Sequence, residues 1–173
     1  MIGRIMDRLN VVAAFAAVIL ALASLPNSSV AQSLKEQLVG TWAVVSVVNE
    51  RDGNKVEPFG PKPVGYFMFA PTGHFQVNIV HPDRPKFAAK IRTAGTPEEY
   101  KAAVLGNIST FGTYTVNPDG WVSYRIIGSS FPNWDGTAQK RLAEITGDQL
   151  KWMVPAASTA NGESTVIVLT RAK

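Results

Sequence analysis

Short runs of β-branched and aromatic residues, separated by glycine and proline at nearly even intervals, constrain this chain more than any other feature. From residue 41 to residue 170 such runs alternate with turn-forming pairs such as Asp52-Gly53 and Gly147-Asp148. β-Branched and aromatic side chains favour extended backbone, while glycine, proline and aspartate favour turns. The pattern therefore predicts an all-β domain of antiparallel strands joined by tight turns.

Eight strands are predicted from this alternation. They cover residues 41–49, 65–70, 74–80, 109–116, 121–127, 137–145, 149–154 and 164–170. Two of the connections, Pro71-Thr72-Gly73 and Asn117-Pro118-Asp119-Gly120, are short enough for hairpins. Even spacing and short turns favour a closed meander, which leaves no exposed edge. We therefore expect an eight-stranded antiparallel barrel.

One short helix interrupts the strands. Thr96 is a good capping residue, Pro97 suits the first helical position, Glu99 completes a capping box, and Gly106 ends the helix. A long proline-marked loop, residues 81–95, precedes it. We expect this helix to cap one end of the barrel, either as a functional cover or as a structural lid over apolar core residues. Leu34 and Leu38 predict one or two further helical turns before the first strand.

The first 31 residues have the parts of a secretory signal peptide. Arg4 and Arg8 precede an apolar run over residues 11–25, and Ser29-Val30-Ala31 supplies small residues for a cut after Ala31. The run has about 15 residues, fewer than the ~20 that span a bilayer, although an uncleaved anchor is the alternative. We expect a signal peptide over residues 1–31, a barrel domain over residues 32–173, and a periplasmic or secreted protein without stable membrane insertion.

Composition excludes several kinds of chemistry. The chain has no Cys, which rules out disulfides, thiolate nucleophiles and Cys-built metal sites. Its net charge is only +4 with scattered Lys and Arg, so nucleic acid is not an expected partner. There is no Gly-x-Ser-x-Gly motif, and only His74, His81 and Asp83 offer themselves as metal ligands. We predict no metal and no cofactor, and the lack of a catalytic set favours a protein that is not an enzyme.

A family resemblance rests on a series of motifs in order along the chain. Gly40-Thr41-Trp42 opens the first strand and Arg171 closes the last, where a guanidinium can stack on the indole. Between them come Pro63-Val64-Gly65, His81-Pro82-Asp83-Arg84-Pro85, Gly95-Thr96-Pro97-Glu98-Glu99-Tyr100, Phe111-Gly112-Thr113-Tyr114 and Phe131-Pro132-Asn133-Trp134. Together they resemble the bacterial and fungal lipocalin-like domain family over essentially the whole mature chain. The resemblance implies a small barrel with a central cavity, and Trp42 buried at its closed end beside Arg171.

Candidate ligand-binding residues come from strand faces. His74 and Gln76 share a polar face that points either to solvent or to a polar-lined cavity. Arg125, on a mostly apolar face, is either an inward anchor for a carboxylate or an exposed residue over an apolar outer wall. Tyr66 and Tyr114 are candidate wall groups, and Trp134 is a candidate rim residue. The predicted pocket lies under the 81–106 segment, with Arg125 and Tyr66 or Tyr114 on its wall.

The function these features favour is an exported protein that binds a small hydrophobic or amphipathic molecule in its barrel. Two alternatives stay open at this point. A cavity-based isomerase or cyclase could hold a flexible substrate in a reactive conformation. A structural envelope protein would have a filled core and no ligand.

Overall fold

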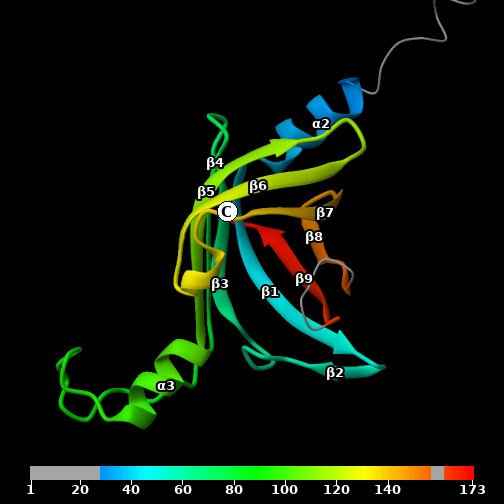
Figure 1. The fold of residues 1–173 in the computed structure, drawn as a ribbon. Coiled ribbons are helices and arrows are strands. Elements are labelled where there is room, and N and C mark those ends of the chain that lie inside the picture. Colours follow the sequence, from blue (N-terminus) through cyan, green and yellow to red (C-terminus); the bar gives the residue numbers. More distant parts are fainter. Residues whose placement is uncertain (1–27, 157–161) are drawn as a thin grey trace, which may run out of the picture.

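The computed structural model describes residues 28–156 and 162–173, which form one antiparallel sheet with two helices and a short 3-10 turn (Figure 1). The helical elements are α2 (Ser28–Leu38), α3 (Pro97–Leu105) and the 3-10 turn η1 (Pro132–Trp134). The strands are β1 (Gly40–Arg51), β2 (Asn54–Val56), β3 (Val64–Phe69), β4 (His74–Val80), β5 (Asn107–Val116), β6 (Trp121–Ser129), β7 (Ala138–Thr146), β8 (Gln149–Val154) and β9 (Ser164–Arg171).

The sheet closes on itself. Neighbouring strands follow chain order from β3 to β9, and β1 pairs with both β3 and β9, so eight strands form a closed barrel. This confirms the predicted architecture, and each predicted strand agrees with the observed one within about two residues. Strand β2 was not predicted, because its three residues are all exposed and carry no apolar alternation. It only extends the β1 end as a hairpin.

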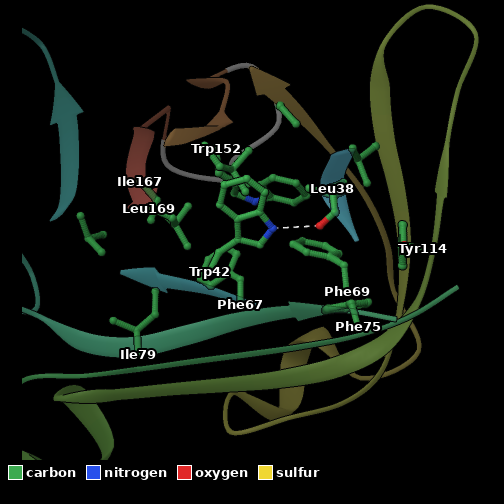
Figure 2. Close-up of a cluster of buried hydrophobic side chains, with 14 of the residues drawn as sticks. Leu38, Trp42, Phe67, Phe69, Phe75, Ile79, Tyr114, Trp152, Ile167 and Leu169 are labelled. Carbon is green, nitrogen blue, oxygen red and sulfur yellow. Dashed lines mark hydrogen bonds between the residues drawn. The ribbon is translucent and has the colours of Figure 1, made fainter. Parts of the chain in front are cut away.

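The end of the barrel where β1 begins is closed by α2, and we call it the closed end (Figures 1 and 2). Leu38, the last residue of α2, is fully buried, and the indole Nε1 of Trp42 donates to its carbonyl oxygen at 2.8 Å. Trp42 is itself 0% exposed. The guanidinium carbon of Arg171 lies 4.2 Å from the Trp42 ring centroid. The predicted plug of Trp42 and Arg171 is therefore confirmed.

The opposite end, where β1 finishes and β9 begins, we call the open end. Helix α3 does not lie across it: α3 has no buried residue, and Val104 and Leu105 are 65% and 68% exposed. The helix and the loop before it extend away from the barrel beyond the ends of β4 and β5 (Figure 1). The expectation that this helix caps an end is wrong, because α3 buries none of its residues against the barrel.

The 81–96 loop explains why α3 stands apart. The backbone N–H of His81 donates to the carbonyl of Gly106 at 2.8 Å, so the segment leaves and rejoins the barrel at one point. The loop then folds onto α3: Phe87 packs edge-on against Tyr100, and the Glu99 carboxylate accepts from the backbone N–H groups of Ala88 and Thr96, each at 2.8 Å. The predicted capping box is present, and the segment makes its contacts internally rather than with the barrel interior.

Candidate functional site

The barrel interior is divided into an apolar half and a more polar half. Strand register places the inward side chains of Trp42, Phe69, Tyr114 and Leu169 toward the closed end. Toward the open end polar inward side chains from four strands join apolar ones such as Ile79 and Ile108. The polar residues are Asn49 on β1, Thr110 on β5, Gln139 and Arg141 on β7, and Thr165 on β9. We call these five the interior polar group.

Arg141 is the charged member of the interior polar group. It is only 7% exposed, and its guanidinium carbon lies 5.1 Å from the ring centroid of Tyr124. Its Nη1 donates to the carbonyl of Lys140 at 2.7 Å, and its Nη2 makes a short hydrogen bond to Oε1 of Gln139. Burial lowers the pKa of Arg141 from its ordinary value, and the neighbouring Tyr124 acts in the opposite direction. Burial is thus the dominant influence on this cation.

Thr110 adds an unused hydrogen-bonding group. The residue is 5% exposed, and its Oγ1 is the single buried side-chain polar atom without a partner among the residues that the structure describes. Leaving such a group unpaired costs about 1–3 kcal/mol. Thr165, by contrast, donates from its hydroxyl to Oδ1 of Asn49 at 3.0 Å. The interior therefore offers a hydroxyl that nothing in the described chain satisfies.

Aromatic rings lie around the Arg141 guanidinium. The Tyr124 ring packs against Phe75 at 4.9 Å and against Trp152 at 6.2 Å between centroids. Trp152 in turn contacts Phe69, and both belong to the buried cluster that Figure 2 shows around Trp42. Burial raises the pKa of the Tyr124 hydroxyl, and Arg141 offsets part of that rise. The surroundings of Arg141 are therefore both aromatic and shielded from water.

The structure corrects the predicted wall of the site. Arg125 is exposed on the outer face, because the inward residues of β6 are Val122, Tyr124 and Ile126. Tyr66 is likewise outward and 51% exposed. The placement of both in a pocket wall is wrong: period two divides a strand into two faces, and the inward face of each strand is the other one.

The remaining predicted residues lie in three different environments. His74 and Gln76 are exposed on the outer face of β4, so the solvent interpretation of that face is confirmed. Tyr114 points inward, but its hydroxyl donates to the carbonyl of Ala70 at 2.9 Å and its ring packs on Phe69, which makes it part of the core. Trp134 is half-buried and packs edge-on against Phe131. The structure does not bring these residues together into one site.

Arg141 was not selected from the sequence, although a signal was present. It lies on the predicted 137–145 strand and shares its alternation with Ala143 and Ile145, while Lys140 and Glu144 share the other. Two charged residues on one face assign that face to solvent, so the Arg141 face must be the inward one.

Two hollows lie away from the interior polar group. One of about 450 Å³ lies between α2 and β7, lined in part by Leu34, Gln37 and Ala143. Another of about 420 Å³ lies within the 81–96 loop, beside Phe87 and Ile91. Neither includes Arg141 or Thr110.

Within residues 28–156 and 162–173, no three His, Asp or Glu side chains cluster as metal ligands, and no helix has the length and apolarity of a membrane span.

Comparison with known proteins supports the resemblance seen in the motifs. The family described as "Lipocalin-like domain" matches residues 39–173. The chain belongs to this lipocalin-like domain family. One relative of the lipocalin-like domain is the "4'-hydroxy-3'-methoxypropiophenone carrier protein ppsC" of Aspergillus oryzae. It is 31% identical over 80 residues, which cover 42% of this chain and 72% of the relative.

Two solved structures are also similar to this lipocalin-like domain. A lipocalin-like protein from Bacteroides uniformis is 13% identical with a TM-score of 0.40, over 75% of this chain and 96% of that one. A redesigned β-barrel is 17% identical with a TM-score of 0.42, over 81% of this chain and 96% of that one.

Proposed function

We propose that this lipocalin-like domain binds a small, largely apolar molecule with a polar group in the open half of its barrel, and carries it without chemical change. The observation that carries the proposal is the buried Thr110 hydroxyl without a partner. A closed barrel that needed only stability would gain from an apolar residue of the same shape at this position, because an unpaired buried hydroxyl is costly.

The composition of the lining supports the same function. Ligand pockets in proteins are lined mainly by apolar and aromatic side chains, with a few polar groups that orient the ligand. The interior has this character around Arg141, whose guanidinium lies over Tyr124, and the Tyr124 ring packs against Phe75 and Trp152. An eight-stranded barrel is also of the size that either fills with side chains or holds one small ligand.

The relative from Aspergillus oryzae indicates a suitable chemical class. The molecule in its name, 4'-hydroxy-3'-methoxypropiophenone, is a flat aromatic ring with a hydroxyl group and a ketone. Such a ring suits an aromatic lining, and its oxygen atoms suit a threonine hydroxyl and a guanidinium. We use that molecule as a probe for this protein.

Isothermal titration calorimetry with 4'-hydroxy-3'-methoxypropiophenone tests the proposal on the purified chain. We expect saturable binding at one site. Thr110→Val should weaken it about three- to tenfold, since one hydrogen bond is worth about 1 kcal/mol. Thr113→Val is the matched control, because Thr113 is an exposed residue of the same strand, and it should change nothing. Absence of saturable binding, or equal effects of both variants, would count against a site in the interior.

We also propose that the protein is exported and that its mature form begins at Gln32. The support is the order of parts in residues 1–31, of which residues 1–27 lie outside the described residues. Intact-mass measurement of protein expressed from the full sequence in a bacterium tests this. We expect a chain starting at Gln32 in the periplasmic fraction, and an unprocessed chain for Ala31→Arg, which places a bulky residue at the cleavage position. An unprocessed wild-type chain would contradict the proposal.

A further inference from the structure

We infer that Arg141 binds an oxyanion, and that the molecule held in the barrel is an amphipathic anion: an aromatic or otherwise apolar body carrying a carboxylate or a related group. This inference rests on the proposed function and specifies the ligand class of the same site. It transfers to Arg141 a role that Arg125, on the outer wall, cannot fill.

The charge of Arg141 has no counterion in the described chain. None of the carboxylates in residues 28–156 and 162–173 lies within 4.0 Å of its guanidinium, and residues 157–161 contain neither Asp nor Glu. Its partners are neutral acceptors, the Lys140 carbonyl and the Gln139 amide. Removing a cation from water without an opposite charge is unfavourable, so a buried cation of this kind calls for an anion from elsewhere.

The position of the guanidinium is already fixed. One face is held against the Tyr124 ring, and two of its nitrogen atoms are held by Lys140 and Gln139. The fork of N–H donors on a guanidinium leaves further N–H groups free of partners in the described chain. A planar fork held in this way matches the two oxygen atoms of a carboxylate, and little conformational entropy is lost when they pair.

The surroundings of Arg141 distinguish it from the other cations. Arg141 is the only charged residue that is buried in the described part of the chain. Arg125 on β6 and Lys140 on β7 are exposed on the outer face, where water screens their charge. An ion pair formed at Arg141 would be shielded from water and correspondingly stronger. The probe ketone also has an oxyanion form, its phenolate. The acyl group para to the hydroxyl makes the phenol more acidic and so favours that form.

Two fluorescent probes of similar shape test the inference. 1-Anilinonaphthalene-8-sulfonate is an anion, and N-phenyl-1-naphthylamine is the same ring system without the sulfonate. We expect Arg141→Met to weaken binding of the anion at least tenfold and to change binding of the neutral probe less than twofold. The control Arg125→Met should leave both unchanged. Displacement of the anionic probe by cinnamate but not by cinnamamide would identify the carboxylate as an accepted group.

The outcomes separate this inference from the proposed function. If the neutral probe binds as tightly as the anion, and Arg141→Met affects neither, interior binding stands and the anionic class is overturned. If neither probe nor the ketone binds, the proposed function fails as well. Should Arg141→Met not fold, Arg141→Gln supplies a second variant, and the cinnamate and cinnamamide comparison on the wild-type chain decides the question without any substitution. Equal displacement by the two compounds would overturn the inference.

Discussion

Arg171, at the end of β9, lies over the Trp42 ring of β1 and is hydrogen-bonded to a backbone carbonyl of α2. Its guanidinium carbon lies 4.2 Å from the Trp42 ring centroid, while Nη1 and Nη2 donate to the carbonyls of Val39 and Gln37 at 3.3 and 2.8 Å. The indole Nε1 of Trp42 donates to Leu38 next to them. The first strand, the last strand and α2 are thus held together at one point of the closed end, beside the pairing of β1 with β9 that closes the sheet.

Trp42→Ala should destabilise the fold by about 3–5 kcal/mol, because it removes a fully buried aromatic side chain and leaves a cavity. Urea unfolding followed by circular dichroism measures the change. Val104→Ala, at a residue of α3 that is 65% exposed, is the control and should stay within about 0.5 kcal/mol. A loss below about 1 kcal/mol for Trp42→Ala would show that the indole does not plug the barrel.

Arg171→Met should cost about 1–2 kcal/mol, since it removes the cation–π contact and both hydrogen bonds to the carbonyls of Gln37 and Val39. Its ion pair with Asp148, at 3.8 Å and largely in solvent, should contribute little. Asp148→Asn is therefore the matched control, and thermal unfolding compares the two. If Asp148→Asn destabilised the protein as much as Arg171→Met, the ion pair rather than the Trp42 contact would hold this end.

The strands could be predicted from the sequence because local rules decide them, whereas the closed end was implied by the family resemblance. Turn residues end each strand, and Thr96, Pro97 and Glu99 together specify a helix start that the structure reproduces. The position of α3 could not be predicted in this way. It depends on the contacts of His81 with Gly106 and of Ala88 with Glu99, which are tertiary.

The site was predicted less well for a related reason. Alternation separates the two faces of a strand, but it does not say which face is inward when both carry apolar residues. On β6 the outer set includes Trp121 and Ile127 beside Arg125, and this made the outer face resemble an inner one. On β7 the charges of Lys140 and Glu144 on one face would have resolved the choice and pointed to Arg141.

Glu99 should make the 81–96 loop sensitive to acid. Hydrogen bonds from backbone N–H groups hold the pKa of the Glu99 carboxyl below its ordinary value of 4.5; the larger effect comes from Ala88 and the smaller from Thr96. A depressed folded pKa means that the stabilisation is fully present above the ordinary value and is lost as the pH falls through the lowered one. The amide NMR shifts of Ala88 and Thr96 should titrate together, with a midpoint below 4.5.

The Glu99→Gln variant is the control for that titration, because it removes the ionising group and should abolish the shared transition. The free energy of global unfolding should change little in Glu99→Gln, since α3 has no buried residue. A midpoint at or above 4.5, or a transition that persists in Glu99→Gln, would show that these amides do not report on the Glu99 carboxylate.

Arg141→Met should stabilise the ligand-free protein, by about 1 kcal/mol or more, although it removes two hydrogen bonds. Methionine has a similar length, suits the aromatic surroundings of Tyr124, and ends the cost of keeping an unpaired cation out of water. The substitution leaves Oε1 of Gln139 without its donor, so the double variant Arg141→Met/Gln139→Leu should be more stable still.

Urea unfolding of protein freed of bound molecules by refolding measures that change in stability. Arg125→Met, on the outer wall, serves as the control and should have almost no effect. A residue that lowers stability when the barrel is empty and raises affinity when it is filled is one that the fold keeps for its ligand. If both Arg141→Met and the double variant lost more than about 1 kcal/mol, Arg141 would instead be a structural anchor of β7.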